Sequence, residues 1–427
     1  MVDVVVNQTN VDKSFQGNWK RSFFTIWTGQ AFSLLGSSLV QFALIWYLTE
    51  KTGSATILAI ASLFGMLPQI LIGPLAGAVV DRWNRKAIMI IADASVALST
   101  LLLIVLFRTD LVQVWHIYLI LFVRSLGGAF HFPAMQSSTS LMVPSNHLPR
   151  VAGINQALRG AMGIAAPPLG ALLVGLLPMH NVLSIDIITA LLAIIPMALV
   201  SIPQPERDNS TASTQPRMSI LDDFRAGLKY VYTWPALMII MGVAMAINFL
   251  FVPAFSLLPL LVTKHFNGGI YQLSWIQSAI GVGMITGGIL LGVWGGFRNK
   301  LNTSVCGLIL MGTGVIAVGI APSNAFWLGV VGIFAAGLSN PLVDGPLFAV
   351  LQSTVEPDMQ GRVLGLIISL GTAVSPLSLL IAGPLSDRFG ISLWYILGGA
   401  TCIIMGIGLR FVPAVMQLES RGHPKPK

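Results

Sequence analysis

The chain has 427 residues, of which 55% are hydrophobic and only 9% are charged. A water-soluble globular protein carries roughly 25% charged residues, because its surface must be hydrated. So few charges cannot cover a surface that faces water, which excludes the soluble classes. The net charge of +8 does not indicate nucleic-acid binding, because the Lys and Arg residues lie in short clusters between apolar runs and form no single basic face.

Apolar runs long enough to cross a membrane recur along the whole chain. A helix needs about 20 such residues to span the hydrocarbon core. The first six predicted spans cover residues 22–48, 54–80, 87–107, 115–143, 151–177 and 181–202. The second six cover 236–263, 272–297, 302–320, 325–351, 363–383 and 391–412. The fold class is therefore all-α integral membrane, with twelve transmembrane helices.

The segment between the sixth and seventh spans is rich in Pro, Ser, Thr and charge, and carries a short amphipathic stretch at 220–232. It divides the chain into two groups of six helices. The predicted organisation is a cytoplasmic segment 1–21, a first six-helix bundle 22–202, a cytoplasmic linker 203–235, a second six-helix bundle 236–412 and a cytoplasmic tail 413–427.

The distribution of basic residues predicts the orientation. With the N-terminus inside, 18 of the 24 Lys and Arg residues fall in cytoplasmic segments and 4 in external loops. Cytoplasmic loops of membrane proteins carry an excess of Lys and Arg. We therefore predict a multi-pass protein of the cell membrane with both termini in the cytoplasm.

The two halves also repeat in sequence. Residues 143–153 (VPSNHLPRVAG) align with residues 355–365 (VEPDMQGRVLG) at a constant offset of 212. Each segment precedes an odd-numbered span. A parallel repeat of six spans places a substrate site near the midplane between the halves, and rocking of one half against the other gives alternating access.

A charged turn follows the second span, in the sequence GPLAGAVVDRWNRK over 73–86. An acid next to several basic residues can hold two helix ends together in one conformation and release them in another, and we expect its glycines to allow close helix approach. The candidate switch residues are Gly73, Gly77, Asp81, Arg82, Arg85 and Lys86. The alternative is a basic loop that only follows the positive-inside rule.

This turn resembles the signature of the major facilitator superfamily, and two further motifs support that resemblance. Residues 124–128 (RSLGG) resemble the buried-arginine motif of its fourth helix. Gly163, Pro167 and Gly170 resemble the glycine-proline motif of its antiporters, with Ala166 where the family has a glycine. Residues 47–55, 130–134 and 361–363 are similar to the macrolide-efflux branch. The counterpart of the charged turn in the second half, residues 295–300, lacks the acid.

Ionisable side chains inside the predicted spans are candidates for proton coupling, because such groups are costly in a membrane and usually face the bundle interior. Arg124 lies at midplane depth. A buried aspartate near it could gain and lose a proton as the conformation changes. The candidates are Arg124, Asp93, Asp344 and Asp186; Arg159 is a fifth charge within a span. The alternative is a permanent ion pair that holds helices together.

Polar residues of the first span recur at steps of three, four and four, which places Gln30, Ser33, Ser37 and Gln41 on one helical face. We predict that this face lines a hydrated substrate cavity. The expected companions are His131, Asn155, Asn248, Gln277 and Asn340. The alternative is that these residues, including His131 beside Pro133, only pack.

The predicted function is secondary active transport. The resemblance implies export of bulky amphipathic, macrolide-like drugs by proton antiport. The expected partners are protons, the substrate and the lipid bilayer, with no nucleic acid, and the expected state is a monomer. No cofactor beyond the proton gradient and no metal are expected, because the sequence has no Gly-x-x-x-x-Gly-Lys-Ser/Thr and no His-Glu-x-x-His motif. The alternatives are an exporter or importer of another small molecule such as a siderophore or metabolite and, from another class, a membrane enzyme or scramblase. No enzymatic activity is expected.

Overall fold

The computed structural model describes residues 19–202 and 220–421, and within these ranges its regular elements are helices. Twelve of the described helices are long and apolar enough to cross a membrane. The prediction of a twelve-helix membrane protein is therefore confirmed. The predicted linker residues 203–219 and both tail ends lie outside the described residues.

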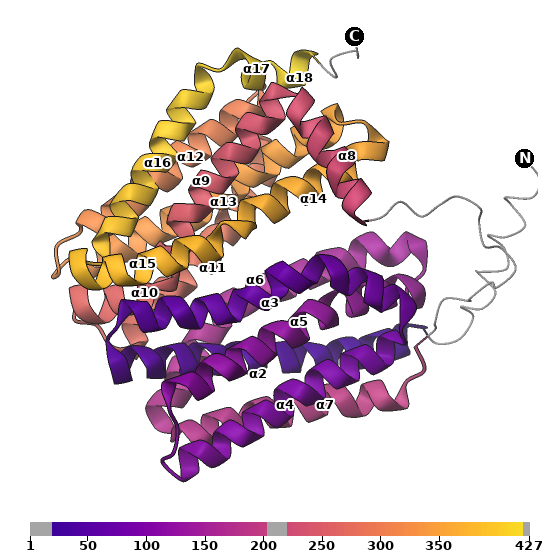
Figure 1. Ribbon diagram of the computed structural model, residues 1–427, viewed down its shortest axis with the longest axis vertical. Coiled ribbons are helices and arrows are strands. Elements are labelled where there is room, and N and C mark those ends of the chain that lie inside the picture. Colours follow the sequence, from indigo (N-terminus) through magenta and orange to yellow (C-terminus); the bar gives the residue numbers. More distant parts are fainter. Residues whose placement is uncertain (1–18, 203–219, 422–427) are drawn as a thin grey trace, which may run out of the picture. The chain divides into compact units, whose positions relative to one another are not determined.

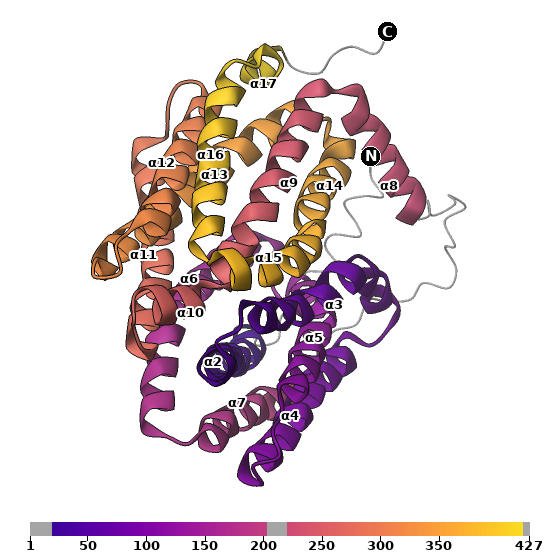
Figure 2. The ribbon, with the colours of Figure 1, turned by 60° about the vertical axis from the view of Figure 1, so that its left-hand side comes forward.

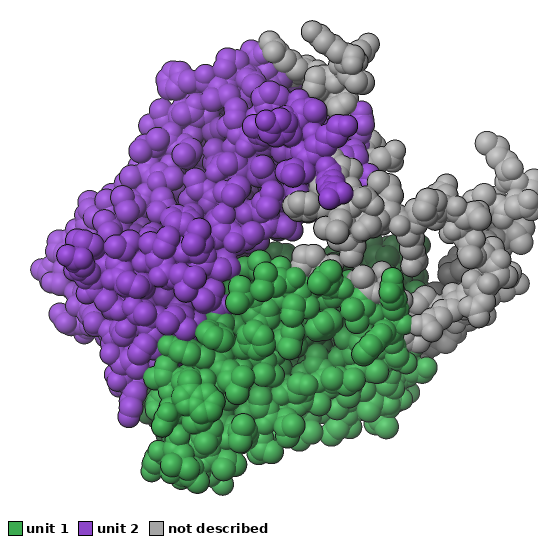
Figure 3. Space-filling model, viewed as in Figure 1, with its two compact units in different colours: residues 1–47, 64–212 green, residues 48–63, 213–427 purple. Residues whose placement is uncertain are grey.

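The chain groups into two compact units (Figure 3). Unit 1 comprises residues 1–47 and 64–212, and unit 2 comprises 48–63 and 213–427. Each unit is described below by itself.

The first helices of the chain are colored indigo to magenta in Figure 1. They are α2 (Trp19–Thr52), α3 (Ala55–Arg82), α4 (Arg85–Arg108), α5 (Val114–Met142), α6 (Leu148–Leu176) and α7 (Met179–Leu199). Within unit 1, α4 packs against both α5 and α7. This packing brings polar side chains of three helices together, as described below.

The remaining helices belong to unit 2. They are α8 (Ile220–Thr233), α9 (Pro235–Ser256), α10 (Leu258–Leu260), the π-helix Leu261–His265, α11 (Ile270–Trp294), α12 (Lys300–Ile320), α13 (Phe326–Thr354), α14 (Pro357–Ala373), α15 (Ser375–Phe389), α16 (Ser392–Arg410), α17 (Pro413–Met416) and α18 (Leu418–Arg421). Helix α8 contains the predicted amphipathic stretch. Its Val231 is fully buried in an apolar cluster with Val363 of α14.

Two predicted spans are interrupted, and prolines explain both interruptions. The seventh span, expected as one helix over 236–263, consists of α9, α10 and the π-helix, with Pro253 and Pro259 near the break. The eleventh, expected over 363–383, changes from α14 to α15 at Val374, two residues before Pro376. Proline removes a backbone donor and its ring clashes with the preceding turn, so it breaks or kinks a helix.

Glycines set the closest helix contacts of unit 2. Helix α12 packs against both α13 and α16 (Figures 1 and 2). A Cβ on Gly399 would lie 2.6 Å from the carbonyl oxygen of Gly312, and one on Gly312 would lie 2.5 Å from that of Gly399. Small residues allow this backbone approach in membranes, where van der Waals packing drives helix association.

Residues 48–63 group with unit 2 because the start of α3 packs closely on α15. A Cβ on Gly383 would lie 2.7 Å from the Cα of Thr56. The carboxylate of Asp387 accepts hydrogen bonds from the backbone N–H groups of Ala55 (2.7 Å) and Thr56 (3.0 Å). It also accepts from the hydroxyls of Thr56 (2.7 Å) and Ser54 (3.1 Å). Asp387 thus satisfies free donors at the first turn of α3, as a capping residue does.

The aligned segments of the two halves end their helices in the same way. The N–H of Val143 bonds the carbonyl of Thr139 at 3.0 Å, and that of Val355 bonds the carbonyl of Leu351 at 2.9 Å. Both valines have extended backbone and are buried. The offset of 212 residues therefore relates equivalent helix ends. The boundaries of the two six-helix bundles stay a prediction.

Candidate functional site

A buried ion pair joins α5 and α7 within unit 1. Nη1 of Arg124 lies 2.6 Å from Oδ2 of Asp186, and their side chains are 9% and 2% exposed. Asp186 also accepts hydrogen bonds from the hydroxyls of Thr100 on α4 (2.9 Å) and Ser37 on α2 (3.1 Å). Nη2 of Arg124 donates to the backbone carbonyl of Ser37 at 3.0 Å. We call Ser37, Thr100, Arg124 and Asp186 the arginine layer.

Close helix approach places these groups. A Cβ on Gly36 of α2 would lie 2.0 Å from Oγ1 of Thr189 on α7, and one on Gly29 would lie 2.6 Å from the carbonyl oxygen of Leu192. Glycine at these two positions of α2 therefore allows the two backbones to approach closely. This contact brings Ser37, the next residue, to within hydrogen-bonding distance of Asp186.

A second polar group surrounds Asp93 of α4. Its Oδ2 accepts a hydrogen bond from Nε2 of Gln30 on α2 at 3.0 Å. Its Oδ1 lies 3.5 Å from Nε2 of His131 on α5. The side chains of His131 and Asp93 are 20% and 14% exposed. We call Gln30, Asp93 and His131 the histidine layer.

The two layers share one spacing. Gln30 and Ser37 on α2, Asp93 and Thr100 on α4, and His131 and Arg124 on α5 are each seven residues apart. Seven residues are two helical turns, so the layers lie about 10 Å apart along the helices. The order reverses on α5, as expected for a helix antiparallel to α2 and α4. Of the two acids that the sequence places near Arg124, Asp186 pairs with it and Asp93 does not.

The predicted polar face of the first span divides between three environments. Gln30 and Ser37 bind the two buried acids. Ser33 between them is buried, at 8% exposure. Gln41 is exposed. The face thus contributes to the interior of unit 1 as well as to its surface.

The candidates on α6 contact other helices of unit 1. Asn155 accepts a hydrogen bond from Nε1 of Trp27 at 2.7 Å. The guanidinium of Arg159 lies over the ring of Phe132 at 4.8 Å, a cation–π contact. In the antiporter-type motif, Pro167 is buried, and a Cβ on Gly170 would lie 2.8 Å from the ring of Phe42 on α2.

The charged turn after α3 anchors helix ends within unit 1. Nζ of Lys86 donates to the carbonyls of Ala198 (2.7 Å) and Val200 (2.9 Å) at the end of α7. Arg85 is buried and donates to the carbonyl of Ser137 on α5 at 2.9 Å. Cations at the carbonyl end of a helix are stabilising. Arg82 is exposed, and the side chain of Asp81 lies outside the described residues.

The close helix approach expected at the glycines of the charged turn is not made at Gly73 or Gly77 in this structure. Among the described residues, no atom lies within 4 Å of a Cβ built on Gly73, Gly77 or Gly163. Gly170 alone of the four motif glycines has such a neighbour.

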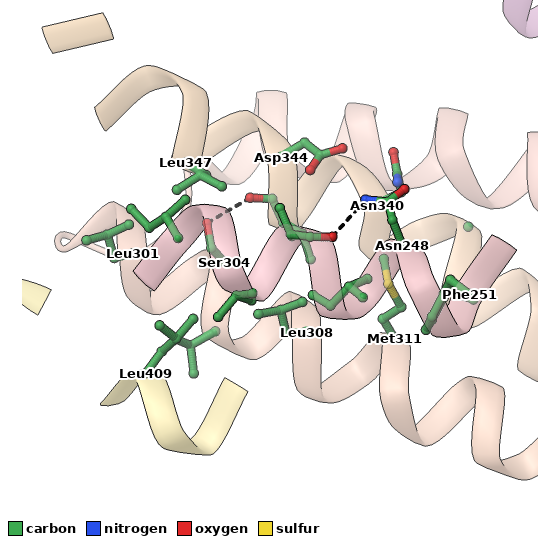
Figure 4. Close-up of a pocket in the computed structure, with 18 of the residues that line it drawn as sticks. Asn248, Phe251, Leu301, Ser304, Leu308, Met311, Asn340, Asp344, Leu347 and Leu409 are labelled. Carbon is green, nitrogen blue, oxygen red and sulfur yellow. Dashed lines mark hydrogen bonds between the residues drawn. The ribbon is translucent and has the colours of Figure 1, made fainter. Parts of the chain in front are cut away.

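Unit 2 contains a cavity of about 330 Å³, lined by α9, α11, α12, α13, α16 and α17 (Figure 4). Its volume lies at the lower end of the range for drug-sized ligands. Most lining residues are apolar, and the polar ones include Asn248, Asn340 and Asp344. Nδ2 of Asn248 donates to the carbonyl of Ala244 at 2.9 Å. Gln277 does not line this cavity.

Asp344 differs from the acids of unit 1. It is exposed, and among the described residues its carboxylate has neither a hydrogen bond nor an ion pair. Asp93 and Asp186 are each bound by side chains from other helices. The expected proton-coupling acids therefore occupy three different environments.

Sequence reasoning missed Thr100, which completes the arginine layer. The available signal was its position seven residues after Asp93, on the same face of α4. It also treated His131 only as a cavity residue, although His131 faces Asp93. The described residues contain no group of three or more His, Cys, Asp or Glu side chains that could hold a metal ion.

Comparison with known proteins agrees with this architecture. The sequence profile of the Major Facilitator Superfamily matches residues 26–378. Macrolide efflux protein A of Streptococcus pyogenes is 34% identical over 403 residues, covering 94% of this chain and 98% of that protein. The multidrug efflux pump Tap of Mycolicibacterium fortuitum is 25% identical, covering 91% and 95%. The crystal structure of a D-xylose-proton symporter matches the fold with a TM-score of 0.67 at 14% identity, covering 92% and 98%.

These matches span nearly the whole chain, and the predicted family is confirmed: the chain belongs to the Major Facilitator Superfamily of membrane transporters. Within that family it is similar to macrolide and multidrug efflux proteins.

Proposed function

We propose that this chain exports bulky amphipathic compounds, macrolide-like in chemistry, across the cell membrane in exchange for protons. Similarity to Macrolide efflux protein A along 94% of the chain is the observation that carries the substrate class. The sequence contains no nucleotide-binding loop of the Gly-x-x-x-x-Gly-Lys-Ser/Thr type, which favours an ion gradient as the source of energy.

Buried acids in membrane helices support the proton-coupled part of the proposal. A charged side chain within the bilayer is costly, so an acid kept there marks an ion or proton pathway by default. Asp93 lies between Gln30 of α2 and His131 of α5 within unit 1. An acid that changes partners between conformations changes its proton affinity, which links proton movement to the conformational cycle.

Alternating access supplies the proposed mechanism. In transporters with parallel six-helix repeats, one half rocks against the other around a site near the midplane. Substrate recognition then falls to the polar and apolar lining of each half. For unit 2, the proposed contacts are Asn248, Asn340 and the apolar side chains of the cavity in Figure 4. An apolar lining with few fixed polar groups suits substrates that vary in shape.

An importer or exporter of another small molecule, such as a siderophore or metabolite, is the second candidate. The fold hosts transport in either direction, so architecture alone does not choose between them. The solved structures with this fold include a D-xylose-proton symporter, so the same fold also carries out symport of a small molecule.

Accumulation assays in cells with and without the protein, across a panel of macrolides and other compounds, test the proposal. We expect the protein to lower the steady-state level of macrolides, and a protonophore to abolish that difference. Export that persists when the proton gradient has collapsed would contradict proton coupling. Accumulation above the control level for any panel compound would favour the importer.

A further inference from the structure

The two polar layers of unit 1 differ in the kind of cation that each contains. The arginine layer pairs Asp186 with a guanidinium, which does not lose its proton in proteins. The histidine layer pairs Asp93 with an imidazole, which exists in a neutral and a protonated form. We propose, resting on the antiport function above, that Asp93 and His131 together bind the exchanged proton, and that Arg124 and Asp186 form a fixed ion pair.

The hydrogen bonds of the arginine layer support a fixed pair. Asp186 accepts from Arg124, Thr100 and Ser37, and its side chain is 2% exposed. The guanidinium of Arg124 is held at two nitrogens, by Asp186 and by the carbonyl of Ser37. Removing either charge leaves the other buried without its partner, which is strongly unfavourable. This pair therefore keeps the same charge throughout the cycle.

The geometry of the histidine layer supports an exchangeable proton. Nε2 of His131 is buried and makes no hydrogen bond within the described residues, although it lies 3.5 Å from Oδ1 of Asp93. That distance is too long for a formed hydrogen bond, yet a small approach would form one. The other carboxylate oxygen is held by Gln30. Gln30 thus orients Asp93 so that its free oxygen faces the imidazole.

The balance of charge is simple. With the proton bound, the layer holds an imidazolium and a carboxylate and is neutral overall. When the proton leaves Nε2 of His131 for water, the layer retains the single negative charge of Asp93. No bond other than N–H is made or broken. The side chains of His131 and Asp93 are 20% and 14% exposed, whereas those of Arg124 and Asp186 are 9% and 2% exposed.

Four other charged side chains of the unit 1 helices have partners of their own. Arg124 of α5 and Asp186 of α7 bind each other two turns away. Arg159 of α6 lies over Phe132. Lys86, two turns before Asp93 on α4, binds carbonyls at the end of α7. Within the described ranges, His131 is therefore the titratable cation that faces Asp93.

The test uses the purified full chain in proteoliposomes with radiolabelled erythromycin and two readouts. One is accumulation driven by an imposed pH gradient, and the other is counterflow, which exchanges labelled for unlabelled drug without net proton movement. The variants are His131→Gln, His131→Lys, Asp93→Asn and Asp93→Glu. His180→Gln is the matched control, because His180 lies in the first turn of α7 and its side chain contacts no acid among the described residues.

We expect His131→Gln, His131→Lys and Asp93→Asn to lose pH-driven accumulation by roughly tenfold or more, as loss of a proton-transfer group does. Their counterflow should stay within about threefold of wild type, because drug binding itself is kept and counterflow needs no net proton movement. The rate of counterflow should no longer vary with pH, because the group that binds the proton is gone. Asp93→Glu should restore part of the coupling, and His180→Gln should behave as wild type.

Three results would overturn the assignment. If wild type is coupled and His131→Gln keeps its pH-driven accumulation, Asp93 and His131 do not bind the exchanged proton together, although the antiport function stands. Equal loss of accumulation and counterflow in all four variants indicates a structural contribution only. Wild-type accumulation that does not depend on the pH gradient overturns both the antiport function and the proton-binding assignment of Asp93 and His131.

Discussion

At the scale of single residues, the central feature is the separation of two acids that the sequence treats alike. Asp93 and Asp186 both fall within predicted spans near a midplane arginine, so either could pair with it. The pairing depends on helix rotation, which sequence spacing alone does not determine. Because Gly29 and Gly36 let α2 approach α7, Ser37 and Arg124 meet Asp186, and Asp93 is left to His131.

The arginine layer should contribute to stability more than to coupling. Arg124→Met or Asp186→Leu should lower the stability of the folded state by roughly 3–5 kcal/mol, because each leaves an uncompensated buried charge. The double variant Arg124→Met with Asp186→Leu should be more stable than either single variant. Thermal unfolding of the purified protein in detergent measures this. Additive losses in the double variant would contradict a coupled buried pair.

At the scale of helices, the length of the apolar runs and the charged or polar residues that separate them predict nearly all of the architecture. Twelve predicted spans correspond to twelve described helical spans, and the aligned segments at 143 and 355 end their helices alike. The interruptions at 257–265 and at Val374 were not predicted. Prolines were visible there, but proline in a membrane helix can produce either a kink or a break, and neighbouring helices decide which.

Helix contacts through glycine can be tested in one helix. Gly399→Ala places a methyl group 2.6 Å from the carbonyl oxygen of Gly312 on α12, which must shift the backbone. Gly408→Ala, also on α16, has no atom of the described residues within 4 Å of its new methyl group. We expect Gly399→Ala to cost about 1–3 kcal/mol and Gly408→Ala to change little. Equal melting temperatures for the two variants would contradict this packing.

At the scale of the whole molecule, the distribution of basic residues predicts the topology. The linker 203–235 and both termini should be cytoplasmic, with Lys51, Arg108 and Lys264 external. Single cysteines at Ser210 and at Lys264, in a Cys306→Ala, Cys402→Ala background, can be labelled with an impermeant reagent in intact cells. Cys306 and Cys402 are the two cysteines of the chain, so their removal leaves the introduced cysteine as its single thiol. We expect labelling at position 264 only; external labelling at position 210 would overturn the twelve-span topology.

The residues of the substrate site are the part of the whole molecule that the sequence predicts least well. The family and its efflux relatives supply a substrate class, and polar residues within spans supply candidate contacts. Asn248, Asn340 and Asp344 do line one cavity of unit 2, but Ser33 is buried and Gln277 lies outside that cavity. Which polar residues reach a cavity depends on a helix rotation of a few tens of degrees, beyond the resolution of a periodic pattern.

Proton-driven macrolide export is tested most directly by the direction of drug movement in proteoliposomes under a pH gradient of either sign. With acid on the side toward which the drug is carried, we expect erythromycin to accumulate above its equilibrium level there. Reversing the gradient should reverse the direction of accumulation, and a protonophore should abolish it. Drug movement of the same rate and direction under both gradients would contradict proton-coupled export.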